Sequence, residues 1–93
     1  MKNLYGSIKI NKVILDGKQS VEECINYYKL KNKKYGFEIV KKDTRNNENI
    51  EVTNITNITD NEEKINKVLR TLVVKQIMPS SSDIIEDLIK QYV

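Results

Sequence analysis

The chain has no histidine, one cysteine and one proline among its 93 residues. Histidine is the usual general base near neutral pH and a common transition-metal ligand, so its absence excludes Ser-His and Cys-His nucleophile pairs. A lone thiol, Cys24, makes no internal disulfide and is typical of a reducing compartment. We interpret Cys24 as a small buried or half-buried residue, with an intermolecular disulfide or a reactive thiol as the alternative. We expect no catalytic activity, no metal and no other cofactor.

Long apolar runs are also missing. No stretch approaches the roughly 20 apolar residues that span a bilayer, and asparagine, glycine and lysine interrupt the N-terminal segment where a signal peptide needs an unbroken apolar run. Gly6, Gly17 and Gly36 are isolated, which excludes a glycine-rich phosphate loop. We expect a cytoplasmic protein without a membrane partner.

The composition that remains is that of a small folded protein with a lean core. Hydrophobic residues make up 39% of the chain, the mean hydropathy is -0.55 and the formal net charge is +3. This charge is too mild to force disorder, and the length suits one domain covering residues 1–93.

Apolar residues alternate over residues 7–15, which predicts a strand that stops at the turn signal Asp16-Gly17. The polar stretch KKDTRNNEN, residues 41–49, is typical of an exposed loop or hairpin end. A further strand is indicated over residues 50–58, where isoleucine and valine alternate with threonine and asparagine.

Residues 20–31 fit two patterns. Ser20 and Glu23 have capping-box spacing, and apolar residues follow at helical intervals. The same residues also alternate at period two and lead through NKKYG into a segment rich in aromatic and β-branched residues. We favour a hairpin over residues 22–42, because a strand, turn and strand make better use of the NKKYG turn.

Two helices are predicted in the C-terminal part. Thr59-Asp60-Asn61-Glu62 carries capping signals, and an apolar stripe follows over residues 60–76. After Pro79, three serines precede a second amphipathic segment over residues 81–92. On that segment, Asp83, Glu86 and Asp87 share a face; we interpret them as complementing the helix dipole and as a solvated face rather than a cation site.

The apolar side chains of the last segment allow two interpretations. They either complete the core of the domain or dock on a second copy or another protein. The residues that we select as candidates for protein binding are Ile85, Leu88, Ile89 and Tyr92.

A lysine-rich and tyrosine-rich stretch, YYKLKNKKYG, is the densest basic segment. Lysines neutralise phosphates and tyrosines stack on unpaired bases, so a hairpin of this composition could hold single-stranded nucleic acid. Lysines also keep an exposed edge strand soluble, which is the alternative interpretation. The candidate nucleic-acid-binding residues are Lys29, Lys31, Lys33, Lys34, Tyr28 and Tyr35.

Three ordered features resemble a small family of clostridia and related Firmicutes whose function is unknown. They are Tyr35-Gly36-Phe37-Glu38-Ile39, then Ile55-x-x-Ile58-Thr59-Asp60 before the first helix, and Pro79 followed by DIIEDLI. The resemblance covers roughly the last two-thirds of the chain. It implies an antiparallel sheet followed by two helices and brings no activity with it.

Strands followed by helices predict an α+β fold: a three- to four-stranded antiparallel sheet over residues 4–58, with two C-terminal helices packed on one face. We expect a small cytosolic protein-binding module, a regulator or adaptor whose partner is another protein or a second copy in a homodimer. The alternatives are nucleic-acid binding through the lysine and tyrosine hairpin, and a phage-encoded inhibitor of a host protein.

Overall fold

The computed structural model describes residues 1–13, 20–43 and 50–93. Four strands form one antiparallel sheet in the order β1-β2-β3-β4, and two helices follow. The strands are β1 (Lys2–Val13), β2 (Ser20–Lys31), β3 (Tyr35–Asp43) and β4 (Ile50–Thr59), and the helices are α1 (Glu62–Val74) and α2 (Ser82–Tyr92). The predicted α+β fold is therefore confirmed.

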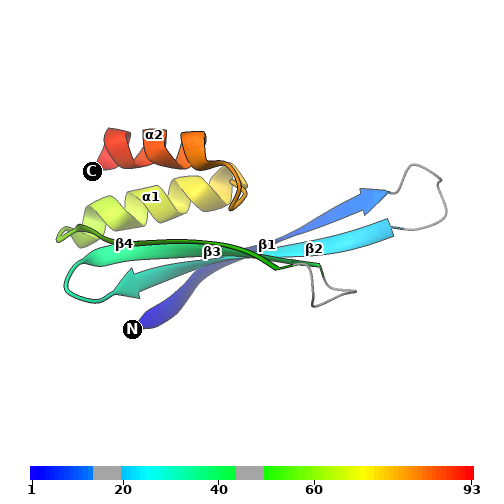
Figure 1. Ribbon diagram of the computed structural model, residues 1–93, viewed down its shortest axis with the longest axis horizontal. Coiled ribbons are helices and arrows are strands. Elements are labelled where there is room, and N and C mark those ends of the chain that lie inside the picture. Colours follow the sequence, from blue (N-terminus) through cyan, green and yellow to red (C-terminus); the bar gives the residue numbers. More distant parts are fainter. Residues whose placement is uncertain (14–19, 44–49) are drawn as a thin grey trace.

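Both helices lie on the same side of the sheet, over one end of it (Figure 1). Helix α1 contacts all four strands, whereas α2 packs on α1. The strands continue past the helices, and the molecule measures 48 × 24 × 17 Å. The sheet thus has one face partly covered by helices and one open face.

Burial on alternate residues explains why residues 20–31 form a strand. Ile25 and Tyr27 of β2 are fully buried, whereas the neighbouring Cys24 and Tyr28 are half-buried and lie on the open face. A helix would have put Cys24, Ile25 and Tyr28 on one side. The hairpin prediction is confirmed and the helical alternative is wrong. Strand β2 pairs with both β1 and β3, so its side chains alternate between the two faces of the sheet.

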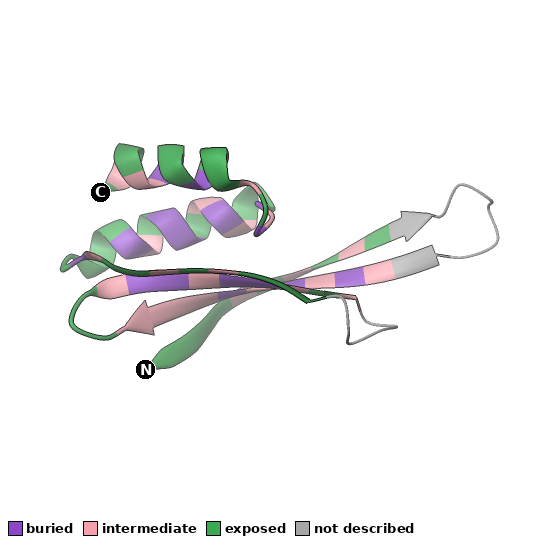
Figure 2. Cartoon of the chain, viewed as in Figure 1, coloured by how far each residue is buried: buried purple, intermediate pink, exposed green. Residues whose placement is uncertain are grey.

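The core is one cluster beneath the helices, where Figure 2 shows the buried segments. Strands β2 and β3 meet the apolar stripe of α1, and residues of α2 and of the connection between the helices complete the cluster. The buried members are Ile25, Tyr27, Phe37, Ile39, Ile65, Val68, Leu69, Leu72, Ile77, Ile85 and Leu88.

Beyond the helices, ion pairs replace apolar contacts on the same side of the sheet. The ammonium of Lys41 lies 3.1 Å from the carboxylate of Glu23 and 3.7 Å from that of Glu51. The hydrogen bond with Glu23 raises the pKa of Lys41. This change from apolar to charged residues marks where the helical cover ends.

Several strand boundaries in the structure differ from those predicted from the sequence. Strand β1 begins at Lys2, before the predicted residue 7, and β3 continues through Asp43 into the segment expected to be a loop. Helix α1 is capped by Asn61, whose side chain accepts a hydrogen bond from the Lys64 amide, while Thr59 accepts one from the Asn61 amide. The predicted turn at Asp16-Gly17 and the rest of the KKDTRNNEN loop, residues 44–49, lie outside the described residues.

Candidate protein-binding surfaces

The candidate residues of α2 divide into two pairs. Ile85 and Leu88 are 2% and 4% exposed, so they belong to the core. Ile89 and Tyr92 are half-buried and pack against that core from its edge. Only Ile89 and Tyr92 therefore present surface that a partner could reach without unfolding the helix.

Tyr92 lines a groove of about 390 Å³ with residues of α1 and its C-cap, and we call it the basic groove. Its other lining residues are Lys67, Arg70, Thr71, Val74 and Lys75. Val74 is 72% exposed. The three cations form no ion pair within the described part of the chain.

Tyr92 was predicted from the sequence as a binding residue, whereas the residues of α1 that complete the groove were not. They carry a signal that could have been noticed: basic residues at positions 67, 70 and 75 surround Val74, an apolar residue that lies off the buried stripe. A helix whose polar face is basic and includes an exposed valine differs from an ordinary solvated face.

The lysine and tyrosine hairpin is split between the two faces of the sheet. Tyr28 pairs with Leu4 and Glu38 on the open face, where the Lys2 ammonium lies 4.3 Å from its ring centroid. Tyr35 lies on the helix side and packs against the core. Because the two rings are on opposite faces, they do not form a single platform for stacked bases.

The lysines of the hairpin are also divided. Lys29 and Lys31 lie over the Tyr35 ring at 5.5 and 4.1 Å from its centroid. Lys29 also pairs with Glu62 at 2.9 Å, and this contact lowers the pKa of Glu62. Two of the four candidate lysines are thereby engaged, Lys29 with the start of α1 and Lys31 with the ring of Tyr35 on β3. The other two, Lys33 and Lys34, are exposed in the turn between β2 and β3.

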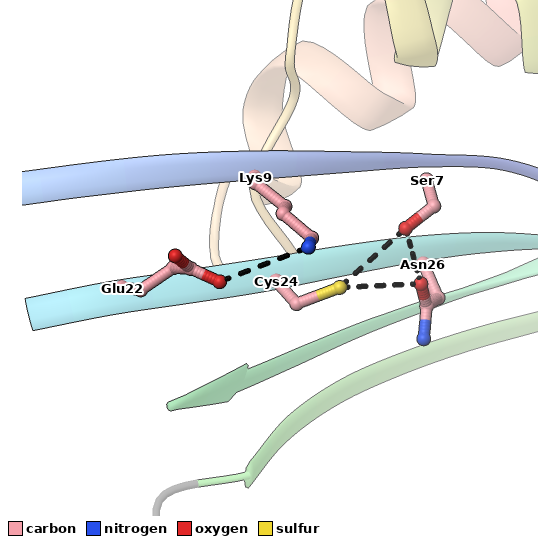
Figure 3. Close-up of polar contacts among 5 residues, drawn as sticks. All are labelled: Ser7, Lys9, Glu22, Cys24 and Asn26. Carbon is pink, nitrogen blue, oxygen red and sulfur yellow. Dashed lines mark hydrogen bonds and ion pairs between the residues drawn. The ribbon is translucent and has the colours of Figure 1, made fainter. Parts of the chain in front are cut away.

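The open face carries a small polar cluster on β1 and β2 (Figure 3). The Ser7 hydroxyl donates to the Asn26 side-chain oxygen at 2.7 Å, and the Cys24 sulfur lies 3.4 Å from the hydroxyl and 3.5 Å from the amide oxygen. An amide oxygen is no base, so Asn26 orients the hydroxyl without activating it as a nucleophile. The expectation that Cys24 is buried or half-buried is confirmed.

A second polar cluster on the open face joins β1, β3 and β4. Glu38 on β3 accepts from the Lys2 ammonium and from the Asn54 amide, each at 2.8 Å. The Lys2 hydrogen bond is the main cause of a lowered pKa at Glu38, and the same bond raises the pKa of Lys2. These contacts fix the positions of β1, β3 and β4 relative to one another.

Among the described residues, no three histidine, cysteine, aspartate or glutamate side chains are grouped so that they could hold a metal ion. Within the same residues, neither helix has the length and apolar character needed to cross a membrane.

The chain matches a known family model. Residues 10–91 match the model of a family of unknown function, DUF6514. The chain belongs to this family. The match confirms the part of the resemblance that assigned the chain to a family of unknown function, and it covers more of the chain than the sequence motifs did. No curated protein and no solved structure matches the chain significantly.

Proposed function

We propose that this DUF6514 protein is a protein-binding module, a small regulator or adaptor without catalytic activity, which contacts its partner through the basic groove. The observation that carries the proposal is Val74, which is 72% exposed in the middle of Lys67, Arg70 and Lys75. A partner that covers Val74 would remove apolar surface from water, and its carboxylates would meet the three cations.

Tyr92 supports the same surface from the other side of the groove. It is half-buried, so its ring is held by the core while part of it remains accessible. Tyrosine is enriched at protein interfaces because a rigid, amphipathic ring contributes contact area at low conformational cost. A bacterial cytoplasm in clostridia and related Firmicutes is the proposed setting.

The test is site-specific photo-crosslinking in cells of the source organism. A photoreactive phenylalanine analogue at position 74 should give a discrete protein adduct, which mass spectrometry identifies. The matched control is the same analogue at position 52, because Val52 is 54% exposed on the open face of the sheet. The adduct should disappear when Arg70→Glu and Lys75→Glu are added.

The proposal fails if position 74 gives no discrete protein adduct or the same adducts as position 52. It also fails if the adduct persists when the cations of the groove are reversed. An adduct with nucleic acid in place of protein would also overturn the proposal, because it would show that the basic groove binds nucleic acid.

A further inference from the structure

The outer face of α2 carries charge of the sign opposite to that of the basic groove. Asp83, Glu86 and Asp87 are exposed, and none of the ion pairs found in the described residues includes them. Ile84 beside them is 50% exposed. Asp83, Glu86 and Asp87 make up this acidic face of α2, and Ile84 lies at its edge next to Asp87, because residues two apart such as Ile84 and Glu86 lie on different sides of a helix.

The two surfaces lie at the same level along the helices. Helices α1 and α2 run in opposite directions side by side, so the end of α1 and the start of α2 are at the same end of the helical layer (Figure 1). Arg70 and Lys75 on or just after the second half of α1 are therefore level with Asp83 and Asp87 on the first half of α2.

Rotation about a two-fold axis parallel to the helices generates a second copy at the same height along that axis, with the positions of α1 and α2 exchanged. Such an axis places α2 of one copy over α1 of the other, so the carboxylates of each copy face the cations of its partner. The contact occurs twice and closes on itself, which gives a dimer rather than a filament.

The opposite end of the helical layer has the reversed charge pattern. Glu63 is exposed in the first turn of α1, and Lys90 is exposed in the last turn of α2. The same two-fold axis brings Lys90 of one copy over Glu63 of the other. Charges of opposite sign thus meet at both ends of the helical layer, which favours this arrangement over a shifted one.

We propose that the protein forms a symmetric dimer in which the acidic face of α2 of each copy occupies the basic groove of the other. This inference rests on the proposed function, since it names the occupant of the groove as a second copy of the chain. It differs from an interface built on Ile85 and Leu88, because those two side chains stay in the core of each copy.

The first experiment measures solution mass by light scattering across protein concentration and salt concentration. The wild type should rise from the monomer mass of 10.9 kDa toward twice that value, and added salt should weaken the association. A wild type that stays monomeric at every concentration would overturn the inference.

Charge reversal then tests the pairing. Arg70→Glu with Lys75→Glu (variant A), and Glu86→Lys with Asp87→Lys (variant B), should each raise the dimer dissociation constant by at least about a hundredfold, because like charges then face each other. Lys33→Glu with Lys34→Glu is the control. It reverses two exposed charges in the β2–β3 turn and should leave the dimer intact.

An equimolar mixture of variants A and B is the decisive sample. In their heterodimer, the reversed groove faces the reversed helix and the other groove faces an unchanged helix, so native mass spectrometry should find the mixed dimer restored. A misfolded variant could not be restored in this way. A wild-type dimer that neither variant splits, or variants that split it but do not pair with each other, would overturn the inference.

The two proposals can fail separately. If the wild type is monomeric while position 74 still crosslinks to another protein, the basic groove binds a different partner and only the dimer is wrong. If position 74 gives no protein adduct at all, both proposals are wrong.

Discussion

The phenolic hydroxyl of Tyr27 donates a 2.8 Å hydrogen bond to the backbone carbonyl of Ile77, and both residues are buried. The bond joins the middle of β2 to the connection between α1 and α2. It therefore fixes where the chain turns after α1 and, through that turn, where α2 starts.

Tyr27→Phe should lower the free energy of unfolding by about 1 to 3 kcal/mol, because it leaves a buried carbonyl without its partner. Urea unfolding followed by circular dichroism measures the change. Tyr5→Phe is the control: Tyr5 is 41% exposed, so its loss should change stability by less than about 0.5 kcal/mol. Equal effects of the two substitutions would contradict the role of the Ile77 bond.

The alkaline stability of the protein should also depend on Tyr27. Burial raises the pKa of Tyr27 from its ordinary value of 10.0 to about 12, which means that the folded state holds this proton more tightly than the unfolded state. This contribution is complete below the unfolded pKa and is lost as the pH rises through the folded one. Absorbance titration of tyrosinate should show a late step in the wild type that Tyr27→Phe lacks. A late step that survives the substitution would assign it to another residue.

Gly36→Ala should be among the most damaging single substitutions. A Cβ at this position would overlap the Ile55 carbonyl oxygen and would lie 2.8 Å from the Thr56 Cα, and these backbone atoms belong to the paired strand. We expect a loss of at least about 3 kcal/mol in the free energy of unfolding.

Gly6→Ala is the matched control for this prediction. Its Cβ would meet only the Val73 side chain, at 3.0 Å, which can shift, so we expect a loss of about 1 kcal/mol. Thermal unfolding of both variants compares the two glycines. A tolerated Gly36→Ala would mean that β3 and β4 do not approach each other as described.

The contact between Lys2 and Glu38 should stabilise the protein at neutral pH and not in acid. Glu38→Gln should cost roughly 1 kcal/mol near pH 7, since it removes a hydrogen-bonded ion pair of which only one partner is well exposed. The pKa of Glu38 is lowered in the folded state, so its contribution is present above the unfolded pKa and is lost as the pH falls through the folded value.

A double-mutant cycle with Lys2→Met, measured by urea unfolding at neutral and acidic pH, isolates this pair. The coupling energy should be clear at neutral pH and should vanish in acid. A coupling energy that does not change with pH would show that the ion pair is not its source.

Leu88→Ala should cost about 2 to 5 kcal/mol, the range for a leucine whose removal leaves a cavity in the core. Ile84→Ala, on the same helix, should cost less than about 0.5 kcal/mol because Ile84 is 50% exposed. Unfolding is measured at a protein concentration low enough that the chain is monomeric. A small effect of Leu88→Ala would contradict the placement of Leu88 in the core and would make it a candidate interface residue again.

The elements of this protein follow from local patterns in its sequence. Strand residues alternate with a period of two and helix residues recur every 3.6 positions, because the backbone geometry of each element sets the spacing of side chains on one face. The helical period predicted the apolar stripes of both helices, including Leu69 and Leu88. Both periods fit the segment around Ile25, and the NKKYG turn decided in favour of a strand there. The α+β order followed from the order of the patterns.

The tertiary structure alone decided how these elements meet. The pairing of Lys31 with Tyr35 put Tyr28 and Tyr35 on opposite faces of the sheet. The sequence places both tyrosines near the same lysines, so the strand register could not be predicted from it. The packing of α2 on α1 likewise brought Tyr92 beside Lys67 and Val74. Contacts between residues distant in the chain depend on the packing of whole faces, whereas periodicity reports only which side of its own element a residue occupies.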